Sequence, residues 1–326
     1  MSEAIVVEDL VKKFKDVTAV DHVSFKVKSG EIYGLLGPNG AGKTTTIHIL
    51  TTLLRPTSGR VYVAGYDVVK QPGEVRKRIG IVFQDPSLDN QLTAYDNMYI
   101  HGRLYGLSGE ELKRKINELL DFVELKPYAN KLVRYFSGGM RRRLEIARSL
   151  LHEPEILFLD EPTIGLDPQT RVKIWDYITA IKKEHGMTIF LTTHYMDEAD
   201  QLCERIAIMD HGKIKAEGTP EQLKSMLGNE VVYVRLDGNL QAAPCLQADF
   251  IESCTQVSKD TLQLVVKNAS TAMPRIFEIA SSSGLRIVEV TYRRPTLNEV
   301  FIHLTGRELR DSLEEGGGPR PVHRRW

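Results

Sequence analysis

The sequence predicts an α/β fold in which helices cover a largely parallel sheet, with an antiparallel β flap, a helical subdomain and a small C-terminal α+β domain. Five short apolar runs recur between stretches of helical pattern, and such runs are typical of strands buried on both faces. They are Ile32–Leu36, Ile79–Phe83, Ile156–Leu159, Thr188–Thr192 and Arg205–Met209. A glycine-rich segment follows the first run and two carboxylates follow the third. The 326 residues are long for one core, so we expect two domains.

The first domain is expected over residues 1–228, and its other elements follow from alternation and helical spacing. Ala4–Val7 and Ser24–Lys28 alternate apolar and polar residues, as the strands of a half-exposed antiparallel flap do. Between Leu92 and Lys131 apolar residues recur at helical spacing. This spacing predicts an inserted helical subdomain at about residues 85–150.

A second domain is expected beyond a linker near Gly228-Asn229. Residues 229–306 carry strand and helix patterns in turn, which indicates a small α+β accessory domain. Its expected elements are the strands Glu230–Leu236, Thr261–Val266 and Leu285–Thr291 and the helices Met273–Ser282 and Thr296–Thr305. The last helix has an apolar stripe, which packs either inside its own domain or in a dimer contact. Residues 307–326 are expected to form a disordered tail.

Composition excludes some classes of function. Lys plus Arg and Asp plus Glu number 43 each, so no net charge draws the chain to nucleic acid or an anionic membrane. The three cysteines lack the spacing of a metal site, which suits a reducing cytosol, and we expect no disulfide. No apolar run approaches the ~20 residues that cross a bilayer. If the protein moves a substrate across a membrane, another chain must form the path.

The segment after the first predicted strand has the spacing of a phosphate-binding loop. Its backbone N–H groups would surround a β-phosphate, its lysine would reach the β and γ oxygens, and the next hydroxyl would take a Mg²⁺ position. A glycine loop that only turns the chain is the alternative, which the complete match in a strand–loop–helix context disfavours. The loop comprises Gly37, Pro38, Asn39, Gly40, Ala41, Gly42, Lys43 and Thr44, and Thr45 follows in the predicted helix Lys43–Leu54.

Two carboxylates, Asp160 and Glu161, follow the third apolar run. A wholly apolar strand delivers them to the edge where doubly wound sheets bind ligands. Asp160 is placed to hold Mg²⁺, directly or through water, and Glu161 to polarise the water that attacks a γ-phosphate. The alternative is that both only cap the turn before Pro162.

The segment Phe136–Met140 stands at the start of another predicted helix, with Ser137 as its N-cap. Three arginines, Arg141 to Arg143, occupy the first turn, where a positive charge opposes the helix dipole. This charge pattern suggests a nearby anion, and a phosphate would suit the glycine N–H groups and the Ser137 hydroxyl. A capped helix with solvated arginines explains the segment equally well.

Together the phosphate loop, the Ser-Gly-Gly segment Ser137–Gly139 and the acid pair resemble the ATPase subunit of an ABC transporter. The resemblance covers about two-thirds of the chain. In that family two ATP molecules lie between the subunits of a head-to-tail dimer. The resemblance implies that Ser137, Gly138 and Gly139 contact the γ-phosphate held by the other subunit. The family pattern has Leu and Gln where this chain has Phe136 and Met140.

The resemblance assigns roles to further residues. Phe14 lies where the family stacks an aromatic ring on adenine, and Gln84 lies where a glutamine touches Mg²⁺ or water. Asp167 lies in a dimer-contact loop that also binds nucleotide, and His194 lies where an imidazole bonds to the γ-phosphate. The implied catalytic residues are Glu161, His194 and Gln84, and the implied metal ligands are Thr44, Gln84 and Asp160.

The segments Phe136–Glu145, Thr192–Ala199 and Pro295–Phe301 are similar to exporter ATPases of the daunorubicin-resistance type. This resemblance implies a homodimeric ATPase that needs ATP and Mg²⁺, binds no nucleic acid, and works on the cytoplasmic face of the cell membrane through a separate permease. An importer ATPase is the alternative. A non-transport ABC ATPase is a further alternative, although such proteins usually have two cassettes or a long coiled coil. A P-loop kinase would leave Ser137 and His194 unexplained.

Overall fold

The computed structural model describes residues 2–226, 230–237, 248–258, 260–283, 285–293 and 295–305. They form two compact units, which divide between Thr219 and Pro220. The expected linker at Gly228-Asn229 and the expected tail at residues 307–326 lie outside the described residues.

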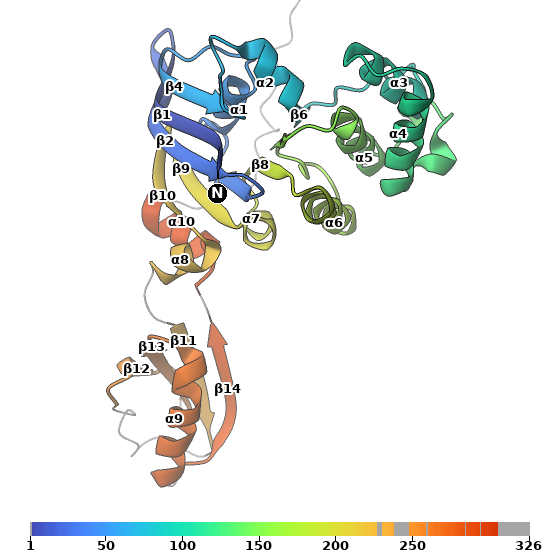
Figure 1. Cartoon of the computed structure of the whole chain (residues 1–326). Helices are drawn as coiled ribbons and strands as arrows, with labels where there is room; N and C mark the ends of the chain where they lie inside the picture. Colours follow the sequence, from blue (N-terminus) through green and yellow to red (C-terminus); the bar gives the residue numbers. More distant parts are fainter. Residues whose placement is uncertain are drawn as a thin grey trace, which may run out of the picture. The chain divides into compact units, whose positions relative to one another are not determined.

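The first unit is built on a six-stranded sheet with the order β10-β9-β3-β8-β7-β6 (Figure 1). All neighbouring pairs are parallel except β10, which is antiparallel to β9. The predicted α/β class is therefore confirmed, and each of the five apolar runs forms a strand within one residue of its expected end. The strands are β3 (Ile32–Leu36), β6 (Ile79–Val82), β7 (Ile156–Asp160), β8 (Thr188–Thr193), β9 (Arg205–Asp210) and β10 (Lys213–Gly218).

A second, antiparallel sheet with the order β2-β1-β4-β5 forms the predicted flap. The rings of Phe25, Tyr33 and Phe190 stack with centroids 5.4 to 5.9 Å apart, and they join the flap to β3 and β8. The strands are β1 (Glu3–Phe14), β2 (Val17–Lys28), β4 (Ser58–Val63) and β5 (Tyr66–Asp67), so the flap is larger than Ala4–Val7 and Ser24–Lys28 predict.

Helices complete the first unit. Figure 1 shows α3, α4 and α5 on the side of the parallel sheet away from β1 and β2. These three helices have a hydrophobic cluster of their own, with Met98, Leu112 and Leu144 fully buried in it, which agrees with the predicted helical subdomain. The helices are α1 (Lys43–Leu50), α2 (Pro72–Arg78), α3 (Ala94–Leu104), α4 (Gly109–Phe122), α5 (Gly138–Leu150), α6 (Pro168–His185) and α7 (Met196–Leu202), with short 3-10 turns at Lys126–Tyr128 and Val133–Tyr135.

The second unit is a small α+β domain with an antiparallel sheet of order β12-β13-β11-β14. Helix α9 packs its buried Ile276 against Val232, Val234 and Leu264 of this sheet. Its elements are α8 (Pro220–Ser225), β11 (Glu230–Leu236), β12 (Ile251–Gln256), β13 (Thr261–Val266), α9 (Ala269–Ser282), β14 (Ile287–Arg293) and α10 (Leu297–Thr305).

The apolar stripe of α10 is buried within the single chain. Leu297, Val300 and Phe301 are at most 1% exposed, and Leu304 is partly buried. Helix α10 contacts α8 of the same unit. The stripe is therefore buried within one chain rather than left for a dimer contact, but its neighbour α8 precedes the predicted domain of residues 229–306.

The cysteine expectation is wrong in one respect. Cys254 on β12 is disulfide-bonded, and its partner lies outside the described residues, whereas Cys203 is a buried free thiol. The count and spacing of cysteines in a sequence do not show whether one of them forms a disulfide in the fold. Among the described helices, none has the length and apolar character needed to span a bilayer.

Candidate nucleotide site

The loop between β3 and α1 has a backbone that favours glycine at two positions. Gly40 and Gly42 have φ angles of +78° and +106°, and a Cβ at Gly42 would lie 2.4 Å from the carbonyl oxygen of Ala19. Gly42 is also the N-cap of α1, where it offers no side-chain acceptor. The first turn of α1 holds no acidic residue, so its N–H groups form a positive end suited to an anion.

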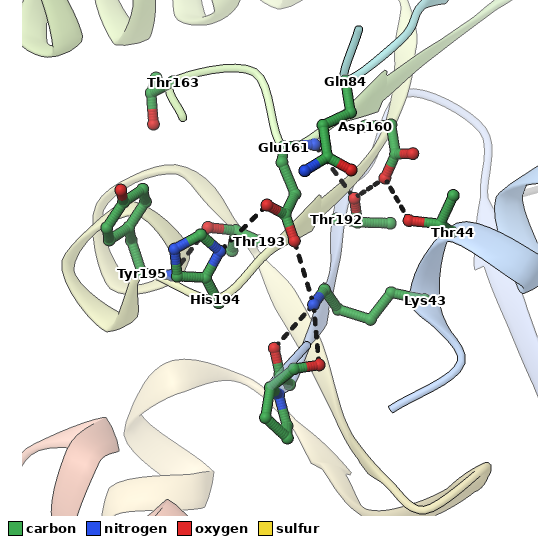
Figure 2. Close-up of polar contacts among 12 residues, drawn as sticks. Lys43, Thr44, Gln84, Asp160, Glu161, Thr163, Thr192, Thr193, His194 and Tyr195 are labelled. Atoms are coloured by element: carbon green, nitrogen blue, oxygen red, sulfur yellow. Dashed lines mark hydrogen bonds and ion pairs between the residues drawn. The ribbon is translucent and has the colours of Figure 1, made fainter. Parts of the chain in front are cut away.

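Lys43, the first residue of α1, points its ammonium group back into this loop (Figure 2). Its Nζ donates to the carbonyl oxygens of Gly37 and Pro38 at 2.8 and 3.1 Å and lies 3.1 Å from Glu161 Oε1. Lys43 and Glu161 are each only 4% exposed at the side chain. Burial lowers the pKa of Lys43, and the charges of Glu161 and Asp160 oppose this effect.

Glu161 stands between two groups that stabilise its negative charge. Its Oε1 faces Lys43, and its Oε2 lies 3.1 Å from His194 Nδ1 at the end of β8 (Figure 2). Burial would raise the pKa of Glu161, but the His194 hydrogen bond and the Lys43 charge bring this pKa below its ordinary value. The side chain is thus a charged carboxylate inside the protein.

The backbone at Glu161 is strained. Its φ is +47°, in the left-handed region that non-glycine residues rarely adopt, at a cost on the order of 1–3 kcal/mol. The Glu161 N–H donates to the carbonyl and to the Oγ1 of Thr192, both at 3.1 Å, and these bonds hold the unusual conformation. Strain of this kind is typical of residues whose direction matters to function.

Asp160 lies at the end of β7 and is 1% exposed. Its Oδ1 accepts hydrogen bonds from Thr192 Oγ1 and, at 3.4 Å, from Thr44 Oγ1. Burial raises the pKa of Asp160, and the Thr192 hydrogen bond opposes this rise. Figure 2 shows the Gln84 side chain directed toward this group from the end of β6.

Mg²⁺ fits these residues. It prefers oxygen ligands and is usually bound by one or two carboxylates, with phosphate and water oxygens completing its shell. Asp160 supplies a carboxylate, Thr44 a hydroxyl and Gln84 an amide oxygen. In keeping with this single carboxylate, the described residues contain no cluster of three or more His, Cys, Asp or Glu side chains that could hold a metal by themselves.

The other predicted residues lie in a second group. Ser137 caps α5 by accepting the Met140 N–H at 3.2 Å, and a Cβ on Gly139 would lie 2.4 Å from the Thr170 methyl carbon. Asp167 caps α6 by accepting the Thr170 N–H at 3.0 Å. In the described part of the chain, no hydrogen bond or ion pair joins Ser137 or Asp167 to the Lys43–Glu161 group. Phe14, 44% exposed at the end of β1, also stands apart, with Lys12 Nζ 4.9 Å from its ring centroid.

The three arginines of α5 do not need an anion to compensate them. Each donates to a backbone carbonyl of its own chain: Arg141 to Arg134 at 3.3 Å, Arg142 to Phe83 at 2.6 Å and Arg143 to Val123 at 3.0 Å. The charge of this helix start therefore does not by itself indicate a phosphate. Arg142 is 6% exposed, so solvated arginines are also a wrong description.

Sequence reasoning missed two supporting residues. Thr192 bonds to both Asp160 and Glu161, and hydroxyls at the end of the otherwise apolar strand β8 were the available signal. Glu198 on α7 is fully buried, and its Oε1 accepts from Thr163 Oγ1 at 2.7 Å and Trp175 Nε1 at 3.0 Å. Glu198 thus links α7 to α6 and to the segment that follows Glu161. An acidic residue in a short helix gives no indication in the sequence that it is buried.

Two family descriptions match the chain: ABC transporter, over residues 20–164, and ATP-binding protein DrrA1-3-like, C-terminal domain, over residues 218–305. The daunorubicin resistance ATP-binding protein DrrA3 of Streptomyces coeruleorubidus is 42% identical over 313 residues, covering 94% of this chain and 97% of that protein. The chain belongs to the ATP-binding proteins of ABC transporters. This family consists of ATPases, so the chain is an ATPase that binds ATP.

This ABC ATPase is also similar to the linearmycin resistance ATP-binding protein LnrL of Bacillus subtilis, which is 36% identical over 308 residues, 93% of this chain and 99% of LnrL. Among solved structures, the dimeric ATP-binding cassette MJ0796 bound to ADP and phosphate is 31% identical, with a TM-score of 0.61, over 66% of this chain and 98% of that one. The resemblance to ABC ATPases, and to the daunorubicin-resistance branch, is therefore confirmed.

Proposed function

We propose that this ATPase is the nucleotide-binding subunit of an exporter and that it works as a head-to-tail homodimer beneath a separate permease. The observation that supports this proposal is that the predicted site residues form two separate groups in one chain. Lys43, Asp160, Glu161 and His194 form one group, and the capped Ser137 forms part of another with no bond to it. A second copy would supply the missing half, and the related cassette MJ0796 is a dimer.

In this proposal the loop Gly37–Thr44 binds the phosphates through its N–H groups, and Thr45 follows in the same turn. Phe14 is free on one face to stack on adenine, since it is 44% exposed. Thr44, Asp160 and Gln84 would hold Mg²⁺, which supplies charge neutralisation at the β- and γ-phosphates when bound. From the partner, Ser137, Gly138, Gly139 and Asp167 would complete the site.

Glu161 is the proposed general base. In the structure its carboxylate is paired with Lys43, whose ammonium group is the natural partner of a phosphate. When phosphate oxygens take over Lys43, Glu161 Oε1 is released to accept a proton from the attacking water. His194 holds the other carboxylate oxygen at 3.1 Å and would donate a hydrogen bond toward the γ-phosphate.

The proposed place of the subunit is the cytoplasmic face of the cell membrane, where ATP is available and where a permease would hold it. Export is favoured over import because the relatives that match nearly the whole chain are named for daunorubicin and linearmycin resistance. The test is co-expression with a candidate permease, beginning with any membrane protein that is encoded next to this chain. Co-purification and drug-dependent ATPase turnover support the proposal, whereas a requirement for an external solute-binding protein would favour import.

The shared site has its own test. A Lys43→Ala chain is mixed with a Ser137→Arg chain, each inactive as a homodimer. In the heterodimer one site carries both defects and the other carries neither, so up to half of the wild-type turnover should return. Heterodimers that form but recover no turnover would contradict two independently working shared sites.

A further inference from the structure

Helix α5 carries a stripe of charged residues among its buried residues. Arg142, Glu145 and Arg148 are three residues apart and so lie along one side of the helix. Arg142 is 6% and Glu145 2% exposed, and their side chains form an ion pair at 3.2 Å. Buried charges are retained in proteins only where partners satisfy them, so the partners of this stripe are informative.

The partners are backbone groups of the segment that carries Gln84. Arg142 donates to the carbonyl oxygens of Phe83 at 2.6 Å and Gln84 at 3.2 Å. Glu145 Oε1 accepts the Ser87 N–H at 2.8 Å. Arg148 donates to the Ser87 carbonyl at 2.8 Å and also to its hydroxyl.

No other element holds this segment in the same way. Residues 84–88, called the Gln84 loop below, make backbone hydrogen bonds only with side chains of α5 in the part of the chain that the structure describes. Residues 84–87 are exposed, and Leu88 packs into the hydrophobic cluster that α5 shares with α3 and α4, so packing holds only the last residue of the loop. Apart from its chain connection to β6, the Gln84 backbone is thus held by α5.

The same helix begins at Ser137. Its 13 residues form one rigid rod, about 20 Å long at 1.5 Å per residue, with Ser137 at its N-terminal end and the charged stripe further along. A shift of Ser137 therefore moves the carbonyls and the amide to which the stripe is bonded. Two groups with roles in different sites of the proposed dimer are joined by one helix.

We propose that Arg142, Glu145 and Arg148 are positioning residues for ATP hydrolysis. They fasten the Gln84 loop to the helix that bears Ser137, so that Gln84 reaches its working position in its own site when Ser137 engages the nucleotide of the partner. This proposal rests on the shared site proposed above. It concerns how Gln84 is placed, and none of the three residues touches the reacting atoms.

The test is a double-mutant cycle in the full-length protein, with kcat and KM for ATP measured for Arg142→Met, Gln84→Ala and the double variant. Each single change should lower kcat about 10-fold, and Arg142→Met should leave KM for ATP within about 2-fold, because Arg142 contacts none of the groups that would hold the nucleotide or Mg²⁺. The double variant should be no slower than the slower single variant, because Arg142 acts through Gln84. Losses that multiply to about 100-fold would overturn the proposal.

Arg143→Met is the matched control. Arg143 lies on the same helix and donates to the Val123 carbonyl at 3.0 Å, with no bond to the Gln84 loop. Its removal should leave kcat within about 2-fold of wild type even where it lowers the melting temperature. An equal loss of kcat in Arg143→Met would show that any disturbance of α5 suffices, against the proposal. Arg142→Lys, which can reach one carbonyl, should recover part of the turnover.

If Arg142→Met does not fold, Arg148→Gln takes its place in the cycle, because Arg148 is partly exposed and folding is less dependent on it. Glu161→Gln, measured alongside, separates the two proposals. If Glu161→Gln retains wild-type turnover, the proposed active site is wrong. If Glu161→Gln is inactive and the cycle is additive, only the positioning role is wrong.

Discussion

Helices α1 and α5 both begin at glycine-rich segments, and they satisfy their first turns in opposite ways. At α1 the N-cap is Gly42, which has no side chain to accept a hydrogen bond, and the positive φ angles of Gly40 and Gly42 shape the loop before it. At α5 the N-cap is Ser137, which accepts the Met140 N–H, and the arginines that follow are bonded to carbonyls. The start of α1 has neither a side-chain cap nor an acidic residue in its first turn, whereas the start of α5 has a side-chain cap.

This difference separates a helix start that belongs to the site of its own chain from one that does not. Lys43 of α1 pairs with Glu161, which in turn bonds to His194 of the same chain. Helix α1 therefore belongs to a site whose charged groups all come from one chain. The arginines at the start of α5 bond to backbone carbonyls of their own chain. In the proposed dimer, Ser137 and the two glycines after it would contact the nucleotide of the partner.

The largest effect is expected at the carboxylate beside α1. Glu161→Gln should lower turnover by about 10²–10⁴, because the amide cannot accept the proton of the attacking water. ATP binding should be retained, and an ATP-bound dimer should accumulate on gel filtration. Glu155→Gln is the control, since Glu155 precedes the same strand with a side chain 62% exposed. Wild-type turnover in Glu161→Gln would remove Glu161 from the role.

The next effect compares the glycines of the two helix starts. Gly42→Ala should lower the free energy of unfolding by at least about 1–3 kcal/mol, because φ is +106° and the Ala19 carbonyl lies 2.4 Å from the new Cβ. At Gly139, a Cβ would meet only the Thr170 methyl, at 2.4 Å, and a helical alanine gains up to about 1 kcal/mol. Gly139→Ala should therefore be near neutral. Urea denaturation measures both, and equal losses would contradict the contrast.

The elements that the sequence predicted best are those whose own residues carry a continuous pattern. The strands β3, β7 and β8 are wholly buried, so an apolar run located each of them. By contrast β4, in which only Val61 and Val63 are buried, and β12, in which no residue is buried, were not predicted. A strand held mainly by its neighbours leaves little pattern in its own residues.

The site shows the same limit. The residues Lys43, Asp160 and Glu161 were predicted because each ends or begins an element with a motif. The pairing of Lys43 with Glu161 and the left-handed backbone of Glu161 depend on three-dimensional placement. Arg142 was interpreted through the helix dipole, whereas its partner Phe83 is 59 residues away. Charges three residues apart on an apolar helix were the signal that would have found it.

A smaller effect is expected at the cap of α5. Ser137→Ala removes the acceptor for the Met140 N–H and should cost about 1 kcal/mol of unfolding free energy. Ser137→Asn keeps an acceptor and should remain close to wild type in the same denaturation experiment. Gly42 has no side chain that could cap α1, so no equivalent substitution can be made there. If Ser137→Ala and Ser137→Asn are equally stable, the cap contributes nothing.

The smallest effect is expected near the C-terminal end of α5, where His101 of α3 lies close to Arg148 and His152. Burial, then the charges of Arg148 and His152, lower the pKa of His101 from 6.5 to about 4. Its Nε2 is buried and has no hydrogen-bond partner among the described residues, so the folded protein holds the neutral ring.

The unfolded chain takes up a proton on His101 near pH 6.5, whereas the folded chain does so only near pH 4. Between these values the unfolded state binds more protons, so the contribution of His101 to stability is present above pH 6.5 and falls as the pH is lowered toward 4. His101→Asn abolishes this linkage. The melting temperature of the variant should therefore decrease less than that of wild type between pH 7 and about pH 5. Parallel pH curves for the two proteins would show that His101 is protonated as easily in the fold as out of it, and that the far end of α5 is open to water.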